Sequence, residues 1–459
     1  MMENSDESVS VVDGQTGGGS AVDIVAGSQV HQRGYRRVTG RISIIRPLSL
    51  LMIPLSIASA QGTDSTYRQH IAAARVSTPV VAQEHLLKAF ALLHGHPDAH
   101  YLLARNAVRL DQPDAAIGHL RTIVAMGLWY DAEHDSVLTP LHDRADFVAV
   151  LSAMAANRQP ISHATTVVTF EDPDLLAEDL AYDRRGGTFY ASAVHRREIV
   201  SWSRSGKRAV FARTPWSPLA LAVDAGRRTL WVTIAALPQG EGTTADSART
   251  AVLAYDLATG QLRDRYDLPS DGGLHALGDM TLDAAGDPIV SDGFGGGVYR
   301  VDRKRRALSA LVPPSVFHSP QTPAVAPDGR ILVADYSYGV AMVDPATGVV
   351  SWIAHADTVA MNGIDGMYLV DHALYAIQNG TNPERVVRFD LDSSLRQVVD
   401  WSVVERATPN LGDPTHGVVI GDQFYFLANS GWDRFADDGH MTSNGAPARV
   451  VRVAIVRAR

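Results

Sequence analysis

Five side chains that can bind a metal ion or move a proton recur at equivalent places along the chain. These residues, each at the start of an apolar run that resembles a β-strand, are Glu178, Asp279, Gln321, Asp365 and His416. Carboxylate and amide oxygens are the ligands that Ca²⁺, Mg²⁺ and Mn²⁺ prefer. Carboxylates that converge repel one another unless a cation lies between them. If the fold brings these positions together, they predict a divalent cation site; the alternative is a polar channel lining hydrated by water.

The spacing of these residues follows a six-fold repeat. Its members are LAYDRRGGTFYASA, LAVDAGRRTLWVTI, MTLDAAGDPIVSD, PAVAPDGRILVAD, MYLVDHALYAIQN and VVIGDQFYFLAN. Each is a strand, a polar turn and a second strand, and a further strand pair follows, with a period of about 40 to 60 residues. Six such units predict a mainly β fold, a six-bladed β-propeller over 164–459. A β-sandwich would not explain the six-fold register.

The last repeat shows only three strands of its own. ATTVVTF at 164–170 is expected to pair with the final RVVRVAIV and to complete that blade. Closing the ring in this way removes an open sheet edge. The first strand of each blade lines the central channel, so residues that open these strands are expected at one channel mouth. Around the ring they are Glu178 and Asp179, Ser217 and Pro218, Gly278 and Asp279, Gln321 and Thr322, Ile364 and Asp365, and Thr415 and His416.

Residues 61–160 have helical apolar spacing and predict a smaller α-helical domain. Pro97 and Pro113, each followed by Asp, mark two helix starts. The core positions expected of a tetratricopeptide-like helix pair are Leu103, Ala104, Ala107, Ala116 and Leu120. One such unit is too few for a free-standing solenoid. We therefore expect these helices to lean on the propeller, as scaffold or as a docking surface for a protein partner.

Residues 1–60 resemble a polar preface followed by a signal peptide. Basic residues between Arg33 and Arg46 precede an apolar run, Pro47 to Ala60, that ends in a small-x-small pattern. This arrangement predicts cleavage after Ala60 and a periplasmic or secreted protein that begins at Gln61. The alternative is a short buried helix. No later stretch is long and apolar enough to span a membrane, so we expect no membrane contact after the signal peptide is cleaved.

Composition excludes several classes of function. The 459 residues carry a net charge of −9, which argues against nucleic-acid binding. The chain has no Cys, so disulfides, Cys-bound zinc and a thiol nucleophile are excluded. Neither Gly-x-Ser-x-Gly nor His-Glu-x-x-His occurs. Trp216 and Trp432 are aromatic candidates for the border of a pocket at the channel mouth.

Three segments carry a family resemblance. LLAEDLAYDRRGGTFYASAV, SPQTPAVAPDGRILVADYSYGV and GIDGMYLVDHALYAIQNG resemble blades of the senescence-marker-protein, gluconolactonase and regucalcin family. The resemblance implies that Glu178, Gln321 and Asp365 hold a divalent cation, with calcium preferred over Mn, Mg or Zn. Gln321 replaces the family's Asn, and Gly278-Asp279 replaces its Asn-Asp, which leaves Asp279 as the substrate-binding residue.

Two functions are compatible with these observations. The first is an exported, metal-dependent hydrolase of lactones or related esters, in which the cation polarises the carbonyl. Asp365 and His416 are then the catalytic residues, with His416 as a general base. The alternative for His416 is a water-bonded lining residue. The second function is a non-catalytic propeller that binds a ligand or a protein and docks through its helices.

Overall fold

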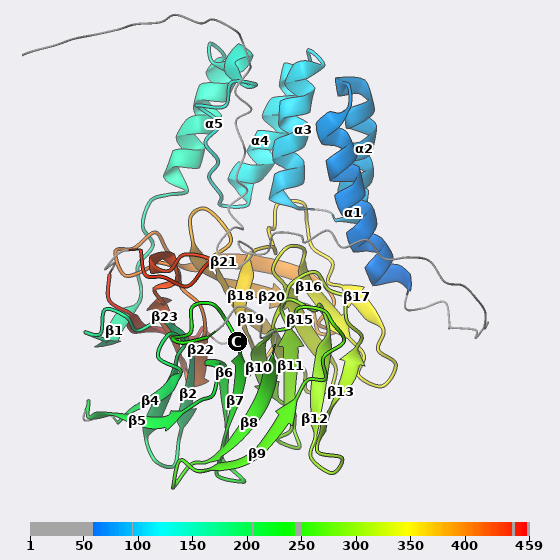
Figure 1. Ribbon diagram of the computed structural model, residues 1–459. Helices are drawn as coiled ribbons and strands as arrows, with labels where there is room; N and C mark the ends of the chain where they lie inside the picture. The colour runs from blue at the N-terminus through cyan, green and yellow to red at the C-terminus, as the bar shows by residue number, and fades with distance from the viewer. Residues whose placement is uncertain (1–57, 94, 204–205, 244–248, 443–445, 457–459) are drawn as a thin grey trace, which may run out of the picture.

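The computed structural model describes residues 58–93, 95–203, 206–243, 249–442 and 446–456. Helices come first in the chain and stand on one end of a ring of six four-stranded sheets (Figure 1). The fold is mainly β, and the predicted six-bladed propeller is confirmed. The apolar run at 47–57 lies outside the described residues, and residues 58–60 open the first helix. Within the described part, no helix combines the length and apolarity that crossing a bilayer requires.

Each blade is an antiparallel sheet whose strands follow one another outward from the axis. The strands of blades 1 to 3 are β2 (Ala177–Asp183), β3 (Thr188–Ala193), β4 (Glu198–Ser203), β5 (Arg208–Arg213); β6 (Ser217–Asp224), β7 (Thr229–Ala235), β8 (Thr250–Asp256), β9 (Leu262–Asp267); β10 (Leu277–Leu282), β11 (Pro288–Asp292), β12 (Val298–Asp302) and β13 (Ala307–Val312). Those of blades 4 to 6 are β14 (Pro320–Val325), β15 (Ile331–Asp335), β16 (Gly339–Val343), β17 (Val350–Trp352); β18 (Ile364–Val370), β19 (Ala373–Gln378), β20 (Arg385–Leu391), β21 (Val398–Arg406); β22 (Gly417–Ile420), β23 (Gln423–Asn429), β24 (Arg449–Ala454) and β1 (Thr165–Thr169).

The ring closes through its first strand, as the sequence predicts. β1 pairs with β24 in antiparallel register, from Thr165 opposite Arg452 to Thr169 opposite Arg449. Within a blade, burial falls toward the rim: every residue of β7 is buried, whereas most of the outer strand β9 is exposed. Apolar residues therefore continue through the inner strands, and charged residues collect at the outer ones.

The described helices are α1 (Ala58–Val76), α2 (Pro79–Leu92), α3 (Pro97–Arg109), α4 (Pro113–Ala125) and α5 (Ala145–Ala156), with the short 3₁₀ turns η1 (Thr139–Leu141) and η2 (Trp432–Arg434). The two predicted starts at Pro97 and Pro113 are confirmed, because Pro at the first helical position loses no hydrogen bond. All five predicted core positions of the helix pair are buried: Leu103, Ala104, Ala107, Ala116 and Leu120.

A buried arginine joins the helices to blade 5. Arg385 Nη1 donates to the carbonyl oxygen of Met126 at the end of α4 (2.7 Å), and Arg385 Nε donates to Gln378 Oε1 (2.8 Å). The carbonyl end of a helix favours a cation. Burial, with Arg406 nearby, lowers the pKa of Arg385 to about 9. The Trp129 N–H also donates to the carbonyl of Asn382 (2.8 Å). The helices thus rest on the propeller, as expected, over the loops of blades 4 and 5.

Candidate metal centre at the channel mouth

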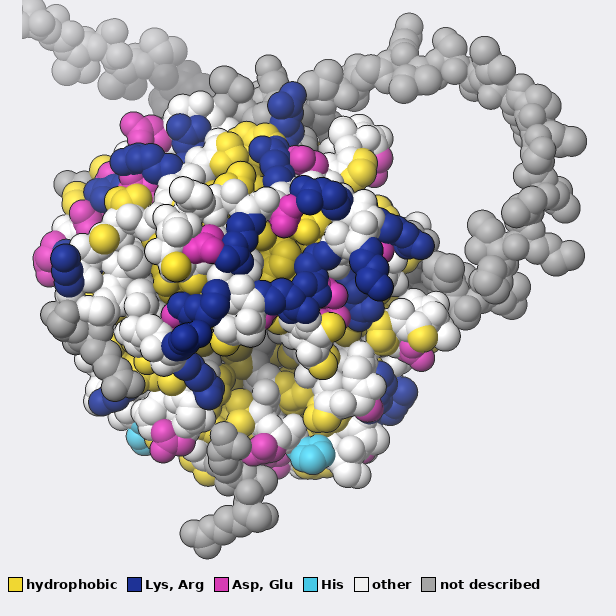
Figure 2. All heavy atoms as spheres, turned by 90° about the horizontal axis from the view of Figure 1, so that it is seen from below, with side chains coloured by type: hydrophobic (Ala, Val, Ile, Leu, Met, Phe, Trp, Pro, Cys, Tyr) yellow, Lys and Arg dark blue, Asp and Glu magenta, His cyan; other side chains and the backbone are white. Residues whose placement is uncertain are grey.

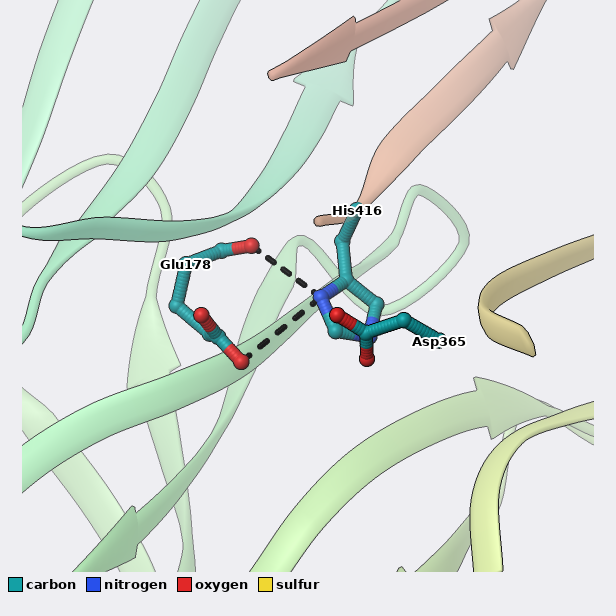
Figure 3. A group of neighbouring side chains, drawn as sticks. All are labelled: Glu178, Asp365 and His416. Atoms are coloured by element: carbon teal, nitrogen blue, oxygen red, sulfur yellow. Dashed lines mark hydrogen bonds and ion pairs between the residues drawn. The ribbon is translucent and has the colours of Figure 1, made fainter. Parts of the chain in front are cut away.

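Three side chains from three different blades meet at the helix-facing mouth of the channel. Glu178 from β2, Asp365 from β18 and His416, which precedes β22, each offer one ligand atom, and these atoms lie within 4.8 Å of one another (Figure 3). All three side chains are buried. Asp279 from β10 joins them, because its Oδ1 contacts His416 Nε2. Four of the five predicted site residues therefore lie close together: Glu178, Asp279, Asp365 and His416.

An irregularity in the inner strands turns these side chains toward the axis. The pairing register shifts by one residue between Ala177 and Leu180, between Leu277 and Asp279, and between Ile364 and Met367. A β-bulge of this kind redirects a side chain that regular alternation would point into the sheet packing. Glu178, Asp279 and Asp365 lie in or at the end of these bulges. The repeat therefore reproduces the local backbone distortion as well as the residue types.

His416 lies among the carboxylates. Its Nδ1 is 3.1 Å from the backbone carbonyl oxygen of Glu178 and 3.8 Å from Glu178 Oε1. Its Nε2 is 3.4 Å from Asp365 Oδ1 and also contacts Asp279 Oδ1. A carbonyl oxygen only accepts hydrogen bonds, so Nδ1 carries a proton. Nε2 is then a donor when the ring is charged, and a ligand or a base when the ring is neutral.

Hydrogen bonds from side chains around the cluster orient the carboxylates of Glu178, Asp365 and Asp279. Trp432 Nε1 donates to Glu178 Oε2, and Asn379 Nδ2 donates to Asp365 Oδ2 (2.7 Å). Thr322 Oγ1 donates to Asp279 Oδ1 (2.7 Å) and also lies 3.0 Å from the backbone oxygen of Asp365. Such donors orient ligands and tune their basicity. Asn379 was missed by sequence reasoning. Its one signal is position, since it directly follows β19 at the same end of the blade.

Burial and the neighbouring charges together shift the pKa values of Glu178 and His416. Burial raises the pKa of Glu178 well above its usual range, and the charges of Asp365 and Asp279 add to this, while His416 and Trp432 oppose it. Burial alone would lower the pKa of His416, but Asp365, Asp279 and Glu178 raise it well above its usual range. The group thus needs positive charge, which either a protonated His416 or a divalent cation supplies. Three carboxylates and an imidazole fit such a cation.

Gln321 and Asp179 have different surroundings. The hydrogen bonds of the Gln321 amide go to Ser319, with Nε2 at 3.0 Å from its Oγ and 3.3 Å from its carbonyl oxygen. Gln321 shares β14 with Thr322, so it lies beside the cluster, and its role as a ligand stays a prediction. The Asp179 carboxylate accepts the N–H groups of Leu180 (2.6 Å) and Leu221 (2.7 Å). Asp179 therefore ties blade 1 to blade 2.

Comparisons with known proteins give structural likenesses only. No family model matches the chain, and no curated protein does. Regucalcin of Agrobacterium tumefaciens, a calcium-binding protein, is similar at 19% identity and a TM-score of 0.46, over 63% of this chain and 94% of that one. A luciferin-regenerating enzyme gives 12% identity, a TM-score of 0.46, and coverage of 64% and 95%. A gluconolactonase of Xanthomonas campestris gives 15%, 0.43, and coverage of 63% and 89%.

Proposed function

We propose that the protein is a divalent-metal-dependent hydrolase of lactones or related esters, with its site at the channel mouth. The observation that carries the proposal is the buried convergence of Glu178, Asp365 and His416. Buried acids seldom gather unless a cation or a shared proton stabilises them. The substrate class comes from the sequence resemblance of blades 1, 4 and 5. Export is proposed from the sequence of residues 1–60, and calcium is the proposed cation.

The residues of the cluster have different roles in this proposal, namely metal binding, orientation of the ligands and proton transfer. Glu178, Asp365 and His416 Nε2 would hold the cation, which when bound polarises a carbonyl and makes a bound water more acidic. Trp432 and Asn379 keep the two carboxylates oriented. When His416 is not a ligand, its Nε2 can accept a proton, and the neighbouring Asp279 carboxylate would stabilise the imidazolium that forms. Backbone bonding of Nδ1 keeps the ring in the orientation that this requires.

The backbone at Gly278, the residue before Asp279, borders open space. A Cβ added at Gly278 would meet nothing closer than the carbonyl oxygen of Ala276, at 4.0 Å. The absent side chain therefore leaves room at the position where the resembling family carries Asn. This supports Asp279 as a substrate-binding residue, in contact with both His416 and Thr322.

A second candidate is a binding module that docks through its helices. Large apolar side chains are exposed on α1 and α2, including Val76, Val80 and Leu87. Exposed apolar groups on neighbouring helices favour contact with a partner. In this reading the channel mouth binds a ligand without converting it.

Calorimetric titration with Ca²⁺, Mn²⁺ and Mg²⁺ tests the first function. We expect wild type to bind at least one of them and to gain thermal stability from it, because a ligand of the native state stabilises that state. Asp365→Ala should lose the binding and the gain in melting temperature. Asp400→Ala, an exposed aspartate on β21 of the same blade, is the matched control and should keep both.

Activity is then measured with simple lactones and aryl esters. Hydrolysis that requires the metal and disappears in Asp365→Ala supports the enzyme. Metal binding without hydrolysis favours the binding module. If wild type binds none of the three ions at millimolar concentration, the metal centre is wrong.

A further inference from the structure

The propeller end opposite the helices carries a concentration of basic side chains. Nine of them lie in or beside the turns of blades 1 to 3: Arg184, Arg185, Arg227, Arg228, Arg263, Arg303, Lys304, Arg305 and Arg306. We call this set the basic face. Figure 2 shows Lys and Arg side chains gathered across this end of the molecule. The whole chain has a net charge of −9, so overall composition does not account for them.

Several of these cations form ion pairs with aspartates that are more buried than they are. Arg228 pairs with Asp183 (2.7 Å), and the side-chain exposures are 29% and 2%. Arg305 pairs with Asp302 (3.6 Å), with exposures of 80% and 28%. The anion of each pair is turned inward and the guanidinium outward. Since a guanidinium has five N–H donors, donors remain for an anion arriving from solvent.

Several of these arginines are held across blade boundaries. Arg228 of blade 2 reaches Asp183 of blade 1, and Arg306 of blade 3 reaches Asp264 of blade 2 (2.7 Å). Within blade 2, Arg263 Nη1 of β9 donates to Thr229 Oγ1 (3.0 Å), the first residue of β7. Side chains that are already ordered lose less conformational entropy when a ligand binds. The basic face is therefore an organised array of cations.

The same end of blades 4 to 6 has the opposite character. Its turns carry the acidic residues Asp328, Asp344, Asp371, Asp392 and Asp422, with Arg330 and Arg396 as basic residues. The turns of blades 1 to 3 also carry the aspartates Asp183, Asp224, Asp256, Asp283, Asp287 and Asp302. Cations therefore exceed anions there by nine to six, whereas anions exceed cations by five to two in blades 4 to 6. Among the described turns, the excess of cations is therefore confined to blades 1 to 3.

We propose that the basic face binds the phosphate groups of an anionic lipid surface. Guanidinium groups match phosphate oxygens in pairs, and a membrane offers phosphates in a plane that can span three adjacent blades. The exposed apolar side chain of Leu262, at the start of β9, lies at the same end and can enter the headgroup region. This peripheral contact departs from the expectation that the mature chain leaves the membrane. It would keep the helices and the channel mouth facing solvent.

Vesicle sedimentation of the full-length protein tests the proposal. The vesicles contain phosphatidylcholine alone, or phosphatidylcholine with about one third phosphatidylglycerol. The variant replaces Arg184, Arg185, Lys304 and Arg305 with Gln, which spares the more buried ion pairs. The matched control replaces Arg75, Lys88, Arg109 and Arg121 with Gln, removing the same charge from exposed positions on the helices. Residues 1–60 are identical in all three proteins.

Wild type and the control are expected to bind the anionic vesicles more tightly than the neutral ones. The basic-face variant should bind at least about tenfold more weakly, since each basic residue near an anionic membrane contributes about fivefold. Added salt should weaken wild-type binding, because it screens exposed charges. Equal weakening of the control, or no preference for anionic vesicles, would overturn the proposal.

Soluble inorganic polyphosphate distinguishes the source of the phosphate. Binding of polyphosphate without binding of vesicles would show that the basic face recognises a free polyanion, and the membrane proposal would be wrong. The melting temperatures of both variants should match wild type, so that altered binding is not altered folding.

Discussion

At the scale of single residues, His416 decides how the channel mouth balances its charge. The ring faces Glu178 on one side and Asp279 and Asp365 on the other. A charged imidazole offsets part of the charge of these carboxylates without any ion, whereas a neutral one leaves Nε2 for a cation or for a proton. The same residue therefore serves as a counter-ion, a ligand or a base, depending on what else the site holds.

Trp432→Phe tests whether the outer contacts matter for the ion. Phe keeps the apolar packing of Trp432 but removes the N–H that Glu178 Oε2 accepts. Loss of such an orienting donor weakens metal affinity by about 10- to 100-fold, and calorimetry measures it. Trp216→Phe is the matched control, because Trp216 stacks on Arg265 away from the cluster. An unchanged affinity in Trp432→Phe would contradict the assigned role.

Sequence reasoning reached the residue types of this site but not their partners. Glu178, Asp279, Asp365 and His416 were predictable because the repeat places each of them at the start of an inner strand. The contacts of Asn379 and Trp432 were not, because they depend on loop conformations that the repeat does not share. The direction of the Gln321 amide, toward Ser319, likewise depends on a side-chain rotamer.

At the scale of elements, α3 and α4 enclose a pair of histidines. His100 Nδ1 lies 3.1 Å from His119 Nδ1, and the ring of Phe90 packs edge-on against His100. Burial lowers the pKa of His100 to about 4, and the neighbouring His119 adds to this. Burial also lowers the pKa of His119. Both rings are therefore held in the neutral form in the folded helices.

This pair predicts that stability falls at mildly acidic pH. Unfolded His100 would titrate near its ordinary pKa of about 6.5, so the unfolded chain binds more protons between that value and the folded one. The contribution is full above about pH 6.5 and is lost as the pH falls toward 4. Melting temperatures at about pH 7 and about pH 5 measure it. His100→Gln should reduce the difference, whereas His134→Gln, at an exposed site, should not. A difference that is unchanged in His100→Gln would refute this account.

The strands and helix starts were predictable because period and Pro placement are local signals. The bulges were not, since they depend on how neighbouring strands pair. Arg385 was also missed: in the sequence it is one of many arginines in strands, and its buried contact with Met126 depends on how the helices dock.

At the scale of the whole molecule, the export proposal concerns which residues the mature protein keeps. We expect mass spectrometry of the exported product to find Gln61 at its N-terminus. Cleavage there would remove the first three residues of α1 and leave Tyr67, whose ring packs edge-on against Tyr338 of blade 4. The helices would therefore keep their contact with the propeller. A mature protein that retains the run from Pro47 would contradict the proposal.

The pairing of β1 with β24 has a consequence for how the protein is made. Synthesis runs from the N-terminus, so β1 leaves the ribosome long before its partner, which is the last strand of the described chain. Until β24 is made, the ring stays open, and the edges of β1 and β23 that pair with β24 keep unpaired backbone groups. A message truncated before Arg449 would yield a chain that has every residue of the metal cluster and still cannot close. Synthesis of β24 is thus itself the step that permits assembly of the ring.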